Sequence, residues 1–91
     1  MKKTYEDLGL VNSESLVNEI KKENKRQLSK FGFKNVSAFQ WMSYLTEEIG
    51  ELAQAINDYK SKKDTNAKKI VTEAIHSATL ALKIAEMFEF E

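Results

Sequence analysis

Apolar residues recur every three or four positions along three segments of the chain, the spacing that places side chains on one face of an α-helix. The first segment carries Leu16, Ile20, Leu28 and Phe31 at this spacing. A polar run at residues 23–27 interrupts the apolar stripe. Gly32 comes directly after Phe31, and a glycine at this position commonly ends a helix. We therefore predict a first helix from Ser13 to Phe31, the least apolar of the three.

The second segment begins at Ser37, a good N-cap because its hydroxyl can accept a hydrogen bond from a free backbone N–H of the first turn. The helix is expected to run to about Tyr59. Its predicted core stripe consists of Leu45, Ile49, Leu52, Ile56 and Tyr59. A charged linker at residues 60–66 contains no apolar residue and is predicted to be a solvated loop.

The third segment predicts a helix from Ala67 to about Phe88. Its expected core face contains Ile70, Ala74, Ala78, Ala81, Ala85 and Phe88, widened by Val71, Ile75 and Leu82. Two long helices joined by a short polar loop form an antiparallel pair, and the first helix is expected to pack across them. The predicted fold is an all-α antiparallel helix bundle, with residues 1–91 as a single domain.

Composition and charge narrow the possible functions. The 91 residues include no cysteine and no proline, and 14 basic side chains balance 14 acidic ones. A disulfide framework, a zinc finger and a thiol nucleophile are therefore excluded. The neutral balance argues against broad nucleic-acid binding, which needs an excess of Lys and Arg. No N-terminal apolar run and no membrane-spanning stretch is present. We expect a cytoplasmic protein without a membrane or nucleic-acid partner, and a partner subunit that completes its small core.

An acidic group lies in the middle of the second predicted helix, at residues 47–51. Helical spacing places Glu48 and Glu51 on one line with Trp41, Tyr44 and Ala55, beside the core stripe. A bare carboxylate in a dry site costs several kcal/mol unless a cation, a proton or hydrogen bonds compensate it. Gly50, between these carboxylates, indicates either a close approach to the helix backbone or the packing of a neighbouring helix.

The third predicted helix carries a matching line of Glu73, His76, Leu80, Lys83 and Met87. In an antiparallel pair, Glu48 and Glu51 can face Glu73 and His76. A cluster of carboxylate oxygens suits Mg²⁺ or Mn²⁺, and the imidazole moves the preference toward manganese, iron or zinc.

Plainer interpretations stand beside these hypotheses. A run of glutamates alone is usually a solvated acidic face. The Glu73-x-x-His76 pattern at the matching place on the next helix favours a functional cluster instead. A single histidine is more often satisfied by a neighbouring hydroxyl or carboxylate than bound to a metal. Core packing is the default role of Trp41 and Tyr44, and Lys83 is at least as readily a surface lysine.

At these residues the chain resembles the MazG-like all-α nucleoside triphosphate pyrophosphohydrolases. That family is marked by Glu-Glu-x-x-Glu on one helix and Glu-x-x-Asp on the next. Glu47, Glu48 and Glu51 match the first half, and 21 residues separate Glu51 from Glu73. The preceding Phe31-Gly32, Ser37 and Trp41, and Leu45-Thr46 before the glutamates, are similar to small, phage-type members. The resemblance covers about residues 31–88, and His76 departs from it where the family has aspartate.

The resemblance implies an enzyme that splits a nucleoside triphosphate into the monophosphate and pyrophosphate. It implies a homodimer or homotetramer, and Mg²⁺ (or Mn²⁺) held by Glu48, Glu51, Glu73 and His76. Glu47, Glu48, Glu51 and Glu73 are the implied catalytic residues, with Glu47 or Glu48 beside the attacking water. The family points to deoxynucleotides or damaged nucleotides as substrates.

Substrate contacts are predicted from position. Trp41 precedes Glu48 by seven residues, or about 10 Å along a helix, so it could stack on the base while the metal holds the triphosphate. Phe33 or Phe39 could serve instead. Lys83 is the predicted phosphate contact, and the loop lysines Lys60, Lys62 and Lys63 could close over phosphate.

Two other functions remain open. Glutamate on one helix and Glu-x-x-His on the next is half of the ligand set of ferritin-like dimetal carboxylate proteins, which a symmetric dimer would complete. The third possibility is a catalytically silent helical interaction module.

Overall fold

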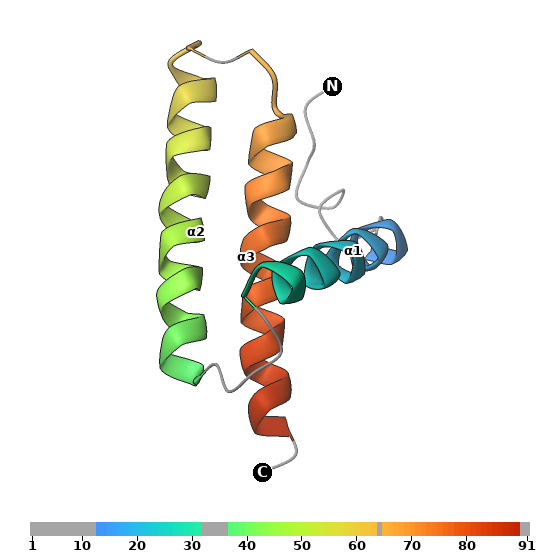
Figure 1. The fold of residues 1–91 in the computed structure, drawn as a ribbon. Helices are drawn as coiled ribbons and strands as arrows, with labels where there is room; N and C mark the ends of the chain where they lie inside the picture. Colours follow the sequence, from blue (N-terminus) through green and yellow to red (C-terminus); the bar gives the residue numbers. More distant parts are fainter. Residues whose placement is uncertain (1–12, 32–36, 64, 90–91) are drawn as a thin grey trace.

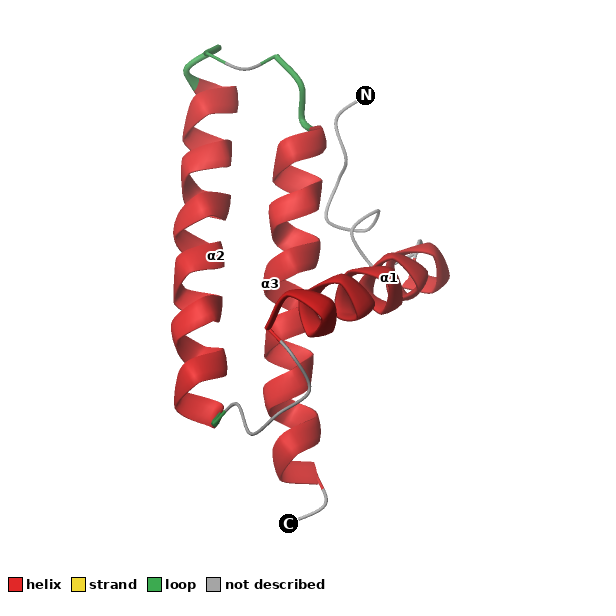
Figure 2. Cartoon of the chain, in the orientation of Figure 1, coloured by secondary structure: helices red, strands yellow, loops and turns green. Residues whose placement is uncertain are grey.

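The computed structural model describes residues 13–31, 37–63 and 65–89, and this part of the chain contains three helices and no strand. They are α1 (Ser13–Phe31), α2 (Ala38–Lys60) and α3 (Lys68–Glu89). The predicted all-α class is confirmed, and the predicted helix ends agree with these bounds to within about one residue. Figure 1 shows α2 and α3 side by side and antiparallel, with α1 crossing α3 at a steep angle, and Figure 2 shows the same helices by secondary structure.

The ends of α2 follow from short polar contacts. Ser37 and Gln40 form a capping box: Ser37 Oγ accepts from the Gln40 N–H at 3.2 Å, and Gln40 Oε1 accepts from the Ser37 N–H at 2.9 Å. At the other end, Lys62 takes a left-handed conformation with φ of 64°, and its N–H donates to the Tyr59 carbonyl. Asn66 Oδ1 then accepts from the Lys68 N–H at 2.9 Å and starts α3.

The face that α2 turns toward α3 differs from the predicted core stripe. Ile49, Ile56 and Tyr59 are 49%, 37% and 45% exposed, so their predicted burial is wrong for the single chain. Instead, Trp41 and Ala55 are buried, and Glu48 lies on the same line between them. The helix is rotated so that the line carrying Glu48 meets α3. Leu45 and Leu52 of the predicted stripe are half-buried, and its other three residues are left on the surface.

The predicted core of α3 is corrected in the same way. Ile70, Ile75 and Ala78 are half-buried, whereas six other residues of the expected face are exposed: Val71, Ala74, Ala81, Leu82, Ala85 and Phe88. α3 is contacted by both α1 and α2, and this double contact covers Glu73, Thr79 and Leu80. The buried apolar side chains of the described residues are only Trp41, Ala55 and Leu80.

Two further features bear on function. A Cβ added at Gly50 would meet nothing within 4 Å, so neither a helix nor another part of the described chain approaches the backbone there. Among the helices of residues 13–31, 38–60 and 68–89, none has the length and apolar character needed to cross a bilayer.

Candidate metal centre

Three potential metal ligands from two helices meet between α2 and α3. Glu48 comes from the middle of α2, and Glu73 and His76 lie one turn apart on α3, so the antiparallel packing brings them together. Their ligand atoms all lie within 4.8 Å of one another. His76 Nδ1 is 3.2 Å from Glu48 Oε2 and 3.6 Å from Glu73 Oε2. Donors bound to one ion at 2.0–2.6 Å are separated by up to about 4–5 Å, so this spread suits a divalent cation.

Glu73 is the most buried of these candidate ligands. It is only 8% exposed, and its Oε2 atom is buried without a hydrogen-bond partner among the described residues. Burial and then the neighbouring Glu48 carboxylate raise the pKa of Glu73, and the opposing effects of Glu51 and His76 do not cancel this rise. A bound cation would favour the ionised form and supply the partner that the buried oxygen lacks.

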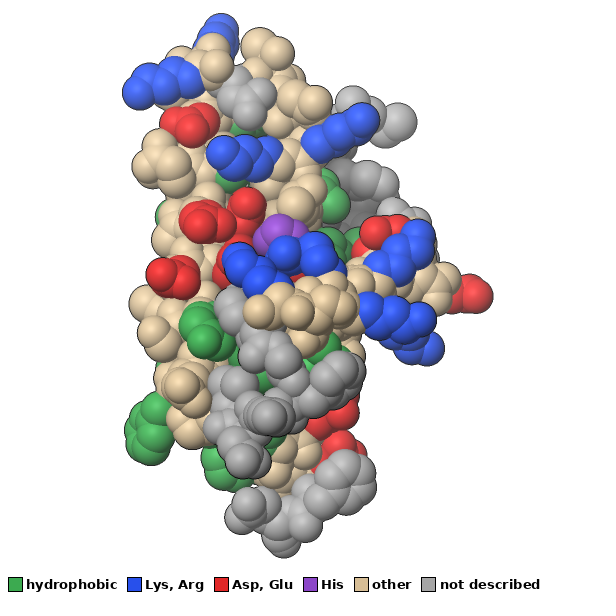
Figure 3. Space-filling view, in the orientation of Figure 1, with side chains coloured by type: hydrophobic (Ala, Val, Ile, Leu, Met, Phe, Trp, Pro, Cys, Tyr) green, Lys and Arg blue, Asp and Glu red, His purple; other side chains and the backbone are tan. Residues whose placement is uncertain are grey.

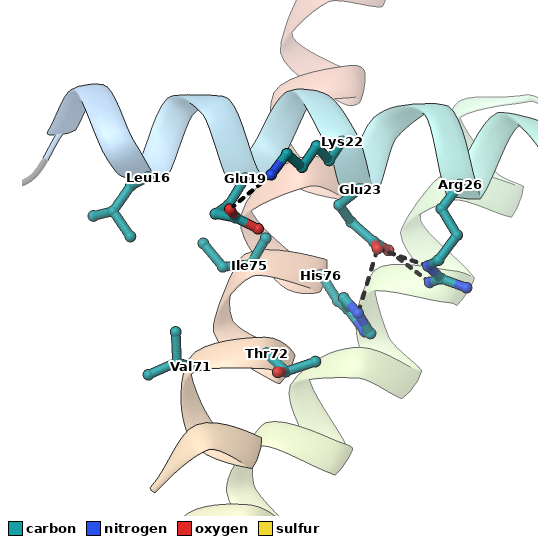
Figure 4. Close-up of a pocket in the computed structure, with 9 residues that line it drawn as sticks. All are labelled: Leu16, Glu19, Lys22, Glu23, Arg26, Val71, Thr72, Ile75 and His76. Carbon is teal, nitrogen blue, oxygen red and sulfur yellow. Dashed lines mark hydrogen bonds and ion pairs between the residues drawn. The ribbon is translucent and has the colours of Figure 1, made fainter.

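A third acidic group approaches from α1, on the other side of the imidazole. Glu23 Oε1 lies 3.4 Å from His76 Nε2 (Figure 4). Arg26 binds the same carboxylate with two hydrogen bonds of 2.6 Å. Burial opposes ionisation of Glu23, but Arg26, His76 and Gln27 together outweigh it and lower its pKa. Glu23 is therefore a charged, buried carboxylate held by a guanidinium.

Gln27 connects this carboxylate to α3. Its side-chain amide is 1% exposed and donates to Glu23 Oε2 at 2.8 Å and to the His76 carbonyl at 3.3 Å. Its oxygen accepts from Lys83 Nζ at 2.5 Å. The network fixes α1 to the turn of α3 that carries the candidate ligands.

The sequence contained a signal for Glu23 and Gln27 that our prediction missed. Leu16 and Ile20 begin a helical stripe, and Glu23 and Gln27 continue it at the same spacing. The polar run at residues 23–27 looked like an interruption of an apolar face. Two polar residues at core positions of an otherwise regular stripe indicate that they pair with something across the interface.

The remaining predicted ligands and acids lie at the margin of the cluster. Glu51 is exposed, but it is close enough to Glu73 to lower its pKa. Glu47 is exposed on the surface of α2. Neither belongs to the group of three donors within 4.8 Å. Their participation in metal binding or catalysis stays a prediction.

The predicted substrate residues are placed close to each other, one helix turn or more from the cluster. Trp41 is 6% exposed and packs edge-on against Tyr44, with ring centroids 5.8 Å apart. Lys83 Nζ lies 4.8 Å from the centroid of the Trp41 ring, and burial is the main cause of the lowered pKa of Lys83. Phe39 is 89% exposed, whereas Phe33 lies outside the described residues. Among the predicted stacking residues that the structure describes, Phe39 has the more accessible ring.

An open groove of about 370 Å³ runs between α1 and α3 past the imidazole. Leu16, Val71 and Ile75 form its apolar wall, and its charged end contains Glu23 and Arg26 (Figure 4). In the space-filling view of Figure 3, the only histidine reaches the surface between acidic and basic side chains. The groove opens on the Glu23 side of the imidazole, and neither Glu48 nor Glu73 lines it.

Searches of protein-family models, curated proteins and solved structures gave no match to this chain.

Proposed function

We propose that the chain is a metal-dependent nucleoside triphosphate pyrophosphohydrolase of the MazG-like type, converting a (d)NTP and water to the (d)NMP and pyrophosphate. One observation supports this most strongly: Glu48 of α2 and the Glu73-x-x-His76 pair of α3 converge within 4.8 Å, as the two half-motifs require. The buried Glu73 Oε2 atom, which has no hydrogen bond within the described residues, is a second observation that supports a cation site.

Glu48, Glu73 and His76 would hold the ion, Mg²⁺ or Mn²⁺, with Glu51 at the edge of the site. A bound divalent cation neutralises phosphate charge and polarises water. Glu47, which is exposed, or Glu48, which is half-buried, would accept a proton from the attacking water. Arg26, whose side chain is 49% exposed, adds a fixed positive charge at the end of the groove, although its existing pair with Glu23 limits how freely it can move.

Two or more copies are expected to complete the fold. The chain exposes 7430 Å², whereas a compact monomer of 10.5 kDa should expose about 5400 Å². The exposed surface includes large apolar side chains. Exposed side chains on α2 and α3 include Met42, Ile49, Ile56, Tyr59, Val71, Leu82 and Phe88. We propose a homodimer or homotetramer in which these faces are covered by other copies.

A ferritin-like dimetal protein is the second candidate, and one observation favours it. Glu23 from α1 and Glu48 from α2 both approach the Glu73-x-x-His76 pair, which gives two glutamates from two helices beside a Glu-x-x-His motif. The salt bridge between Glu23 and Arg26 weighs against a ligand role for Glu23. Aerobic iron loading that produces a near-ultraviolet absorption band would favour this candidate.

The decisive assay is pyrophosphate release from common and modified NTPs and dNTPs, with Mg²⁺ and Mn²⁺ in parallel. We expect turnover of at least one nucleotide, abolished in Glu51→Gln and unchanged in Glu19→Gln, an exposed glutamate of α1. His76→Asp restores the aspartate of the resembling family and should preserve or raise the activity with Mg²⁺. Complete loss in His76→Asp would contradict the assignment of the fourth ligand position. Absence of turnover with every nucleotide and both metals would leave a silent interaction module as the better account.

A further inference from the structure

We propose that Glu23 is a positioning residue that fixes the tautomer of His76: it accepts a hydrogen bond from Nε2–H and leaves Nδ1 to bind a divalent cation between Glu48 and Glu73. The proposal rests on the metal centre of the proposed function, but it requires neither turnover nor a nucleotide.

The imidazole lies between two carboxylate groups of different character. On its Nε2 side, Glu23 Oε1 is 3.4 Å away. On its Nδ1 side, Glu48 Oε2 lies at hydrogen-bond distance, 3.2 Å, and Glu73 Oε2 lies at 3.6 Å, and a cation bound between these two candidate ligands would replace the Nδ1–Glu48 hydrogen bond. The two ring nitrogens therefore face different helices and have different tasks.

Glu23 differs from the candidate ligands because both of its carboxylate oxygens already accept hydrogen bonds from neighbouring side chains. Arg26 binds both of its oxygens, and Gln27 donates to one of them. A carboxylate held in this way is poorly placed to become a metal ligand. It remains a good acceptor for an N–H, because each carboxylate oxygen can accept more than one hydrogen bond.

A neutral imidazole carries its proton on one nitrogen and binds metal through the other. Histidine ligands generally donate their second N–H to a carboxylate, a backbone carbonyl or water, and this contact orients the ring and makes the ligand nitrogen more basic. Glu23 occupies that place for His76. The Gln27 bridge to the His76 carbonyl holds the backbone of the same turn.

This arrangement makes α1 part of the metal centre. Glu48 and Glu73 alone offer oxygen ligands, which suit Mg²⁺. With Nδ1 fixed toward them, the site has one nitrogen and two carboxylates, and its preference moves toward Mn²⁺, Fe²⁺ or Zn²⁺. Loss of the Glu23 contact should therefore lower the affinity for metals that favour nitrogen ligands more than it lowers the affinity for Mg²⁺.

His76 is the only histidine of the chain, so all imidazole ¹⁵N signals come from one ring. The experiment records the ring ¹⁵N spectrum of the zinc-loaded protein and measures Zn²⁺ and Mg²⁺ affinities by calorimetry. Wild type is compared with Glu23→Gln and with Glu19→Gln. Glu19→Gln removes a charge one turn earlier on α1, beside the same groove, from a residue that pairs only with exposed Lys22 in the contacts described.

We expect zinc on Nδ1 and a proton on Nε2 in wild type. Glu23→Gln should weaken Zn²⁺ binding by about 10–100-fold, and Mg²⁺ binding by less, while Glu19→Gln binds as wild type does. Zinc on Nε2, or equal Zn²⁺ affinity in Glu23→Gln and Glu19→Gln, would overturn the role of Glu23 and leave the metal centre standing. Absence of Zn²⁺ binding in wild type would overturn both. If Glu23→Gln does not fold, the wild-type spectrum still shows whether Nδ1 or Nε2 binds zinc.

Discussion

Glu73 holds a carboxylate where the surrounding protein does little to compensate its charge. Only 8% of the residue is exposed, and its Oε2 atom is buried without a hydrogen bond in the described part of the chain. Such groups are a cost to folding unless a ligand uses them. We therefore expect Glu73 to lower the stability of the metal-free protein, although the same carboxylate is well suited to bind a cation.

Glu73→Gln should therefore raise the melting temperature of the metal-free protein at neutral pH. A pKa raised in the folded state means that the carboxyl contributes fully to stability below its ordinary value of about 4.3, and this contribution is lost as the pH rises through the raised pKa. The advantage of the glutamine variant should accordingly be small in acid and grow toward neutral pH. About 1 kcal/mol moves the melting temperature of a domain of this size by roughly 4–8 °C, so calorimetry at several pH values measures it. Equal melting temperatures at all pH values would contradict the account.

At the level of single residues, sequence reasoning predicted that Glu48, Glu73 and His76 would meet, because these residues lie beside the core faces of adjacent helices, and the structure brings them together. That they bind a metal stays a prediction. Sequence reasoning missed Glu23, since no spacing within α1 shows which turn of α3 lies opposite. It also could not place Trp41 against Lys83, because that contact depends on how the two helices are rotated.

In helix α2, local sequence determines where the helix begins and ends, whereas tertiary packing determines which face is buried. Its bounds are set locally, by the Ser37 capping box and the left-handed Lys62, and both ends were predicted closely. Its rotation depends on its neighbour. Ile49, Ile56 and Tyr59 of the predicted apolar stripe remain exposed, while the line with Trp41, Glu48 and Ala55 faces α3. An apolar stripe predicts that a face will be covered, but it does not say by which helix or which copy.

The capping box gives a direct stability test at one end of α2. Ser37→Ala removes the acceptor for the Gln40 N–H and should cost about 1 kcal/mol in the free energy of unfolding. Ser43→Ala, an exposed serine in the interior of the same helix, is the matched control and should be neutral or slightly stabilising. Chemical denaturation of both variants measures the difference. A loss in Ser43→Ala as large as that in Ser37→Ala would show that the cap is not the cause.

Gly50 tests whether the middle of α2 is open. Since a Cβ there meets nothing within 4 Å, Gly50→Ala should stabilise the helix by about 1 kcal/mol. The reciprocal variant Ala53→Gly, at an exposed position of the same helix, should lose a similar amount. Thermal unfolding of the two variants measures both effects. Destabilisation by Gly50→Ala would mean that another copy of the chain approaches the backbone at this point.

The whole molecule has too little core for its surface. Only three apolar residues of the described chain are buried, and the exposed area exceeds that of a compact monomer by roughly 2000 Å². An interface of standard size buries about 1600 Å² in total, or about 800 Å² of each chain, so covering this excess needs the larger interface that obligate oligomers form. The all-α class and the helix order were predictable from periodicity. The extent of the exposed apolar faces was not, because the sequence does not show how much of each face α1 covers.

Light scattering combined with size exclusion should give the mass of at least a dimer for the wild-type chain. Ile56→Glu places a charge within the exposed apolar stripe of α2 and should shift the protein toward monomer with loss of stability. Asn57→Glu adds the same charge at the neighbouring exposed polar position and should leave the mass unchanged. A monomeric wild type, or equal masses for both variants, would contradict this interface.

We expect Glu48, Glu73 and His76 to bind one divalent cation, and a Mn²⁺ titration followed by electron paramagnetic resonance measures this binding. Saturation should occur at one Mn²⁺ per chain in wild type and in Glu19→Gln, and this binding should be lost in Glu73→Gln. A wild type that leaves Mn²⁺ free in solution, or a Glu73→Gln variant that binds it as tightly as wild type does, would show that these side chains form no metal site.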